Sequence, residues 1–471
     1  MRQRRSSARW LITGALAAAV CVGAAGAAEP SGAEKGDPAA EWAVELIDSV
    51  TEVGYHVSVA TDPVTGRIFI SYYDGATGEL QMAKMGGPHH NCGPSNSWSC
   101  SVLDSGDVVG KYNSIAVGGT GPIGTYYVSY YDSTNGALKV IEGTIDRETG
   151  VMTKFIRFID RGDPGGEVYT GKYTSIDVGG SGTPHIAYQV DVGALQGIKY
   201  ATRVAEGTGN CGEGDVENDW ECSHVHLESD IGEFIAIDVS AGGTPSIAFS
   251  TAFALDTYPV LATRVVSGGT CNNSDLWNCE GVRHMGNDTS DWLAFVIGDN
   301  AQPHLFYRNA TTESLEWATF VETGGNCGGL RWECRTIESI GYDSLLSGIA
   351  AEIDDDRNPV VVYQDVESGN LDLKIARPRE ALNYSAAGNC GPLSPTMFHT
   401  WRCETLDAGD LSHDEAVGGL SISMDSRGQA AVAYRELFDP ISSPEEGRLK
   451  VALEPTWIFA DGFESGNTSA W

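Results

Sequence analysis

Tyrosine, histidine and arginine side chains recur at two fixed positions of a segment that the chain repeats seven times. At the first position five copies carry a ring, and at the second an aromatic residue is followed by Tyr, Gln, Ser or Arg. Rings stack on sugars and arginine pairs with carboxylates, so this set suits an acidic sugar. Tyr or His could also remove a proton beside a carboxylate that Arg neutralises.

Residues that break the repeat are better functional candidates than residues that every copy shares. The candidate ligand-binding residues are His56, Tyr73, Tyr112, Tyr131, Tyr173, Trp292, Arg308 and Arg435. Phe234 is the fifth ring at the first position. Packing between repeats is the alternative interpretation for all of them, and no catalytic residue is assigned.

Two further positions are shared so widely that the fold itself explains them. All seven copies carry an aromatic residue in the second strand, which favours packing between neighbouring repeats over a sugar platform. These are Tyr72, Tyr130, Tyr188, Phe249, Tyr307, Tyr363 and Tyr434. An acid or amide follows in six copies, where calcium binding and turn formation are the alternatives. Turn formation is favoured, since DGATGEL and DSTNGAL read as hairpin turns, and we expect no metal and no cofactor.

Other catalytic signatures are missing from the sequence. It has no G-x-S-x-G, H-E-x-x-H or phosphate-binding glycine loop. The segment SMDSRG (423–428) resembles part of a sialidase Asp-box, but it occurs once and lacks the Thr-Trp ending.

Ten of the eleven cysteines form five neighbouring pairs. The gaps within the pairs vary from six to twelve residues, which suits covalently closed loops better than zinc knuckles. We expect disulfides, and therefore an oxidising compartment. The predicted bonds join Cys92 with Cys100, Cys211 with Cys222, Cys271 with Cys279, Cys327 with Cys334, and Cys390 with Cys403.

The repeated unit predicts the fold. Segments such as KYTSIDVGGSGTPHIAYQVD (172–191) alternate apolar and polar residues on both sides of a turn, which is typical of a β-hairpin. A third strand and then a fourth, beginning at W-x-C, follow in most copies. The chain starts with a lone fourth strand (41–49) and ends after a third one. We therefore predict an all-β fold, a seven-bladed β-propeller with four-stranded blades, whose ring closes when the N-terminal strand completes the last blade.

The chain ends and the charge indicate export. A basic start and an apolar run predict a signal peptide (1–28), followed by a linker (29–40), the propeller (41–455) and a C-terminal tail (456–471). No later segment could span a membrane as a helix. The net charge of −34 excludes nucleic acid as a partner.

Several phrases resemble a repeat family common in secreted bacterial proteins. YTSIDV, PHIAYQ, SYYDSTNGALKV and W-x-C-E-T-L-D are similar to its units, which read roughly "YTSIAVD–PHISYYD–LKYA–W–ETVDS". The resemblance covers residues 41 to about 453 and implies the propeller fold but no activity. The tail IFADGFESGNTSAW (458–471) resembles the DGFESG-type tail of exported bacterial proteins, which implies sorting or maturation; a flexible acidic tail is the alternative.

Three functions fit these observations. We expect a secreted or cell-surface binding or scaffold protein that recognises a glycan or an extracellular protein on the channel face. The alternative is a polysaccharide lyase or glycoside hydrolase acting on acidic polysaccharide at the same face, by fold-level analogy. A purely structural surface protein is the third. The sequence does not indicate the oligomeric state.

Overall fold

The computed structural model describes much of the chain between residues 42 and 455. The segments outside the description are 50–51, 87–89, 163–167, 194, 214–217, 229–230, 232–233, 254–255, 273, 283–291, 342–347, 367–371, 379–387, 394–398, 409–418 and 438–446. The expected signal peptide, linker and C-terminal tail also lie outside the described residues.

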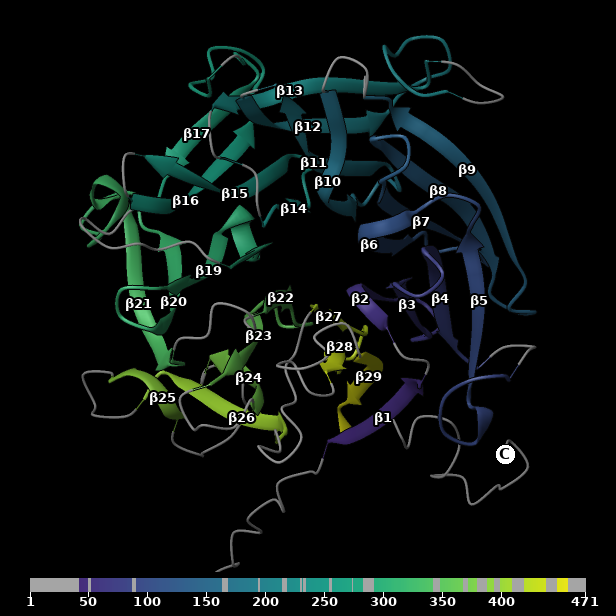
Figure 1. The fold of residues 1–471 in the computed structure, drawn as a ribbon. Helices are drawn as coiled ribbons and strands as arrows, with labels where there is room; N and C mark the ends of the chain where they lie inside the picture. Colours follow the sequence, from purple (N-terminus) through teal and green to yellow (C-terminus); the bar gives the residue numbers. More distant parts are fainter. Residues whose placement is uncertain are drawn as a thin grey trace, which may run out of the picture. The chain divides into compact units, whose positions relative to one another are not determined.

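Seven antiparallel sheets are arranged as a ring around a central axis, so the predicted seven-bladed propeller is confirmed (Figure 1). Blades one to three follow the chain in order. Blade one holds β2 (Val53–Thr61), β3 (Ile68–Asp74), β4 (Glu79–Met85) and β5 (Trp98–Asp104). Blade two holds β6 (Val109–Gly118), β7 (Ile123–Asp132), β8 (Ala137–Asp146) and β9 (Met152–Asp160). Blade three holds β10 (Val168–Val178), β11 (Pro184–Val192), β12 (Leu195–Arg203) and β13 (Trp220–Glu228).

Blades four to seven complete the ring. Blade four holds β14 (Ala236–Val239), β15 (Pro245–Phe253), β16 (Asp256–Arg264) and β17 (Trp277–Gly281). Blade five holds β18 (Leu293–Ile297), β19 (Pro303–Asn309), β20 (Ser314–Phe320) and β21 (Trp332–Ser339). Blade six holds β22 (Ile349–Ile353), β23 (Pro359–Asp365), β24 (Asp372–Pro378), β26 (Trp401–Asp407) and an added β25 (Gly388–Leu393). Blade seven holds β27 (Leu420–Met424), β28 (Ala430–Leu437), β29 (Gly447–Leu453) and β1 (Ala43–Asp48).

The N-terminal strand closes the ring as predicted. Strand β1 pairs antiparallel with β29, with Ala43 opposite Leu453 and Val44 opposite Ala452. The first described strand is thus the outermost strand of the last blade. A closed ring avoids the two open ends that a linear array of blades would have. The described part of the chain holds short 3₁₀ helices at Pro94–Asn96, Asp299–Ala301 and Gly328–Leu330. None of the helices in the described part of the chain has the length and apolar character of a membrane span.

The shared aromatic residue of the second strand joins neighbouring blades. In five interfaces its phenol donates a hydrogen bond to an acid at the end of the preceding blade's outermost strand. The pairs are Tyr72–Asp48, Tyr130–Asp104, Tyr188–Asp160, Tyr363–Glu338 and Tyr434–Asp407. In four of them a lysine from the third strand also binds that acid: Lys139, Lys199, Lys374 and Lys450. We call this set the interblade latch, and it confirms packing as the role of the shared aromatic position.

All five predicted disulfides are present, and each lies within one blade. Each bond joins the segment before the fourth strand to the second residue after that strand's tryptophan. The bonded pairs are Cys92 and Cys100 in blade one, Cys211 and Cys222 in blade three, Cys271 and Cys279 in blade four, Cys327 and Cys334 in blade five, and Cys390 and Cys403 in blade six. The sequence prediction is therefore confirmed for all ten cysteines.

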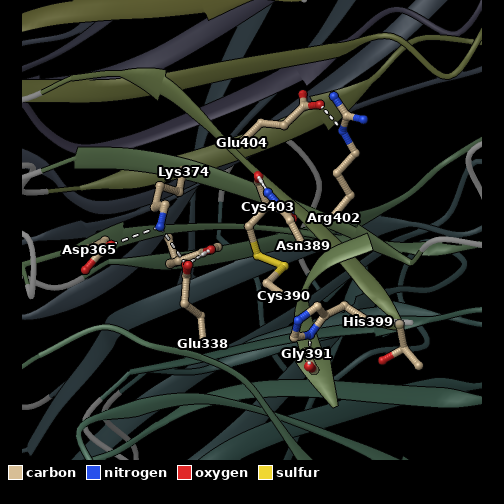
Figure 2. The surroundings of a disulfide bond; sticks show 12 residues. Glu338, Asp365, Lys374, Asn389, Cys390, Gly391, His399, Arg402, Cys403 and Glu404 are labelled. Carbon is tan, nitrogen blue, oxygen red and sulfur yellow. Dashed lines mark hydrogen bonds and ion pairs between the residues drawn. A yellow bond between two sulfur atoms is a disulfide. The ribbon is translucent and has the colours of Figure 1, made fainter. Parts of the chain in front are cut away.

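The surroundings of one bond show how the backbone beside it is satisfied. Figure 2 shows the Cys390–Cys403 bond, next to which Asn389 caps the backbone of Cys403 through hydrogen bonds to its amide and carbonyl. Disulfides persist in oxidising compartments, so the chain has the covalent chemistry of an extracellular protein.

Three of the six shared acids and amides after the second strand, Asp74, Asp132 and Asn309, accept hydrogen bonds from turn amides. The other three form ion pairs with lysines: Asp191 with Lys172, Asp365 with Lys374, and Glu436 with Lys450. Asp74 accepts from the amides of Ala76 and Thr77, and Asn309 accepts from those of Thr311 and Thr312. These bonds are the turn chemistry that the sequence predicts.

Candidate binding site at the channel mouth

Bulges at the start of the innermost strands turn large rings toward the mouth of the channel. In β2, β6 and β10 the pairing register shifts between Tyr55 and Ser58, between Lys111 and Ser114, and between Lys172 and Ser175. A bulge inserts unpaired residues and re-aims their side chains. His56, Tyr112 and Tyr173 are the first residues of these insertions, with φ of 48°, 54° and 48°. Phe234 has the same left-handed backbone, with φ of 55°.

The five rings form a continuous arc that we call the aromatic collar: His56, Tyr112, Tyr173, Phe234 and Trp292. Successive ring centroids are 4.3, 4.4, 6.1 and 4.5 Å apart along five neighbouring blades. All five side chains are partly exposed. Left-handed backbone at a bulky residue costs free energy, and such strain persists where the surroundings or the function require it.

Glycine interrupts the collar in blades six and seven. In blade five, Trp292 directly precedes the residue that pairs with the shared tyrosine of the second strand. Gly348 and Gly419 occupy this same position in blades six and seven. Gly419 has φ of +80°, and a Cβ there would lie 3.4 Å from the amide nitrogen of His56. Among the described residues, the collar therefore covers five sectors of the mouth, and glycine takes the place of the ring in the other two.

The predicted residues of the second strand lie behind the collar. Tyr73 lies 6.5 Å from His56, and Tyr131 lies 6.3 Å from Tyr112, between ring centroids. The amide of Arg308 donates to the carbonyl of Trp292 at 3.2 Å. The guanidinium carbon of Arg435 lies 3.3 Å from the ring centroid of Tyr55.

The eight candidates therefore gather on one face in two rows of different accessibility. Arg308 is 1% exposed and Arg435 is 3% exposed, and Tyr73 and Tyr131 are also buried. The sequence predicts contact with a ligand for both rows, whereas the structure exposes only the collar row. The buried row supports the rings from behind.

The surroundings of the mouth keep His56, Tyr73 and Tyr131 neutral at neutral pH. Burial, and then the charges of Lys111 and Arg435, lower the pKa of His56 from 6.5 to about 4. Burial also raises the pKa of Tyr73 and of Tyr131 above the usual value of 10. Neither tyrosine is therefore activated as a base.

A second feature, at the other end of the innermost strands, was not predicted from the sequence. One segment from each of the seven innermost strands lines a cavity of about 550 Å³ along the channel. Six carboxylates line it, and three of them, Asp177, Asp238 and Glu352, stand at one shared position of the innermost strands. They occupy the place held by Ala60, Ala116, Val296 and Ser423 in the other blades. This break in the repeat is the signal from which sequence reasoning could have found them.

Of these three channel acids, Asp177 and Asp238 accept hydrogen bonds from the inner edge of the next blade, whereas Glu352 accepts from the amide of Ile353 in its own strand at 3.0 Å. The amide of Val239 donates to Asp177 at 2.9 Å, and that of Ile297 donates to Asp238 at 2.6 Å. Ser423 accepts from the amide of Thr61 in the same way, so a neutral side chain also satisfies this edge. Burial raises the pKa of Asp177, and burial together with the charge of Asp177 raises that of Asp238. Burial raises the pKa of Glu352 to about 7.

Comparison with known proteins gives similarity to solved structures only. No family model and no curated protein sequence matches the chain. AofleA from Arthrobotrys oligospora is 13% identical with a TM-score of 0.41, over 78% of this chain and 90% of that one. The polysaccharide lyase Uly1 is 9% identical with a TM-score of 0.45, over 88% and 99% of the two chains. An α-L-arabinanase of Penicillium chrysogenum, solved with arabinobiose, is 10% identical with a TM-score of 0.40, over 73% and 93%. These values are too low for a function to be transferred.

Proposed function

We propose that this protein is a secreted binding protein that recognises a glycan at the aromatic collar. The observation that carries the proposal is the unbroken arc of five rings on successive blades, four of them on left-handed backbone. Glycine adopts the same left-handed backbone without strain, as Gly419 does in blade seven. A ring that only occupied space at this position could therefore be replaced by glycine. Retained strain at accessible aromatic residues is typical of a functional surface.

The chemistry of the mouth favours a sugar that carries negative charge. Aromatic faces pack against the C–H faces of sugar rings. Lys111 lies beside the collar, with its amine 5.6 Å from the ring centroid of Tyr73, whereas the neighbouring Lys172 is paired with Asp191 at 2.7 Å. The Lys111 amine places a positive charge at the mouth of a chain whose net charge is −34, and that charge would attract a carboxylate or sulfate group.

Catalysis at the same face is the second candidate, and the pKa shifts disfavour it. A lyase needs a base whose pKa lies near the working pH. The pKa of His56, at about 4, is too low for efficient proton abstraction, and burial raises the pKa of Tyr73 and Tyr131. Binding without turnover is therefore the expected behaviour.

A glycan array, run with neutral and acidic polysaccharides, tests the proposal. Tyr112→Ala and Trp292→Ala should each weaken binding about tenfold, the loss expected for one stacked ring. Phe155→Ala is the matched control, because Phe155 is an aromatic residue on β9 that is 62% exposed and lies outside the collar. Release of unsaturated products would instead support the lyase alternative. Absence of both binding and turnover on every glycan would contradict both candidates.

A further inference from the structure

The interface between blades three and four lacks the interblade latch. Phe249 stands where other blades have the latch tyrosine, and Val260 is its cross-strand neighbour where others have lysine. His226 takes the place of the latch acid, and its ring lies 5.6 Å from that of Phe249. With no phenol to bind, the imidazole turns its Nδ1 atom toward the Cys271–Cys279 disulfide of blade four.

The imidazole and the two sulfurs lie at the spacing of ligands around one ion. Nδ1 of His226 is 3.7 Å from Sγ of Cys279, and the ligand atoms of His226, Cys271 and Cys279 all lie within 4.8 Å of one another. In a tetrahedral zinc site, with Zn–S of about 2.3 Å and Zn–N of about 2.0–2.1 Å, neighbouring ligand atoms are roughly 3.5–3.8 Å apart. His226 and Cys279 already match this separation.

The hydrogen bonds of His226 prepare Nδ1 as a ligand. The amide of Asn272 donates to Nδ1 at 3.2 Å, so this nitrogen carries no proton. The proton is therefore on Nε2, which lies 3.2 Å from a carboxylate oxygen of Glu228. A carboxylate that orients the far nitrogen of a metal-binding histidine is a recurring feature of zinc sites. Asn272 directly follows Cys271, so opening of the disulfide loop would release the bond that now occupies Nδ1.

We infer that reduction of the Cys271–Cys279 disulfide creates a zinc site formed by both cysteines and His226, with water in the fourth position. A dithiol or phosphine reductant supplies two electrons, the S–S bond breaks, and the reductant is oxidised to a disulfide or, with oxygen from water, to a phosphine oxide. Zn²⁺ then binds the two sulfurs and Nδ1, and two thiol protons leave to solvent. The two thiolates balance the charge of the ion.

Another histidine close to a disulfide provides a matched control. Figure 2 shows His399 beside the Cys390–Cys403 bond, with its Nδ1 atom 2.8 Å from the carbonyl oxygen of Gly391. A carbonyl accepts, so this Nδ1 carries the proton and has no lone pair for an ion. Sequence spacing alone could not show that His226, and not His399, is suited to bind an ion beside a disulfide. The reason is that His226 approaches the sulfurs from the neighbouring blade.

Protection of cysteines from alkylation tests the inference on the full chain. The protein is reduced with a water-soluble phosphine, with or without Zn²⁺ as the only added metal, and is then alkylated. Peptide mapping gives the alkylation rate of each cysteine, so the other four pairs act as internal controls. Zn²⁺ should slow alkylation of Cys271 and Cys279 at least tenfold and leave Cys390 and Cys403 unchanged. His226→Ala should abolish this protection, Glu228→Gln should reduce it, and His399→Ala should retain it.

Three outcomes would overturn the zinc site. They are absence of protection at Cys271 and Cys279, equal protection at all ten cysteines, and undiminished protection in His226→Ala. The melting temperature of the oxidised His226→Ala protein shows whether the substitution itself disturbs the blade. If it does, His226→Gln, which keeps a polar side chain at this interface, replaces it in the same comparison.

Discussion

The phenol of Tyr130 donates a hydrogen bond of 2.6 Å to the carboxylate of Asp104, which belongs to the preceding blade. Both side chains are buried, and Lys139 binds the same carboxylate at 2.6 Å. One phenol, one acid and one amine thus join two sheets that share no strand pairing. Hydrogen bonds to charged groups contribute more to stability than neutral ones, so each latch stabilises the contact between two neighbouring blades.

Removal of one latch hydroxyl should destabilise the ring measurably. Tyr130→Phe leaves the Asp104 carboxylate short of a donor, and we expect a loss of about 1.5–3 kcal/mol in the free energy of unfolding. Tyr307→Phe is the matched control, because the buried Tyr307 hydroxyl has no hydrogen-bond partner in the described structure. Its removal should be neutral or stabilising. Urea unfolding of both variants tests this, and equal losses would contradict the latch.

The left-handed backbone of the collar should make side-chain shape decisive at Tyr112. Asparagine tolerates a φ of 54°, whereas the β-branched side chain of valine does not. Because both substitutions remove the ring, their difference reports on the backbone. Tyr112→Val should unfold at least about 1 kcal/mol more easily than Tyr112→Asn in urea. The same pair at Tyr131, within the regular strand β7, should show no advantage for asparagine; an advantage of equal size there would refute the strain argument.

The channel acid Glu352 should lower stability as pH rises. Burial raises its pKa from 4.5 to about 7. Between these pH values the folded state keeps a proton that the unfolded state releases, so the free energy of unfolding falls as pH increases. Glu352→Gln removes this dependence. Its size in the wild type is at most about 1.4 kcal/mol per pH unit, and it is smaller where channel water screens the charge. In urea unfolding, the free energy of unfolding of the variant should rise relative to that of the wild type between pH 4.5 and pH 8. An equal pH dependence of the two proteins would contradict the raised pKa.

The collar histidine His56 should have the opposite dependence. Burial and the nearby cations lower its pKa from 6.5 to about 4, so the unfolded state binds a proton that the folded state excludes. Stability is then lost as pH falls from 6.5 toward 4. The wild type should lose stability relative to His56→Gln over this range in thermal melts. An NMR titration of the His56 imidazole provides an independent check, and a midpoint near 6.5 would overturn the prediction.

The sequence alone determined the features that are local or repeated. The seven units, the strand order, the cysteine pairs and the completion of the last blade by residues 43–48 could all be predicted. Each of these features depends on residues close together in the chain or on how many times the repeated unit occurs. Alternation, turn residues and a short covalent loop, such as the one that Cys327 and Cys334 close, are local properties that do not depend on how the blades pack.

The tertiary structure decided everything that crosses from one blade to the next. Residues about 60 positions apart meet there, as Asp177 meets Val239, and no periodicity within a strand encodes that contact. Bulges in β2, β6 and β10 placed three of the rings at the mouth, and burial removed Arg308 and Arg435 from solvent. The channel acids and the approach of His226 to Cys279 arise for the same reason. Radial packing sets these distances and the desolvation that shifts the pKa values.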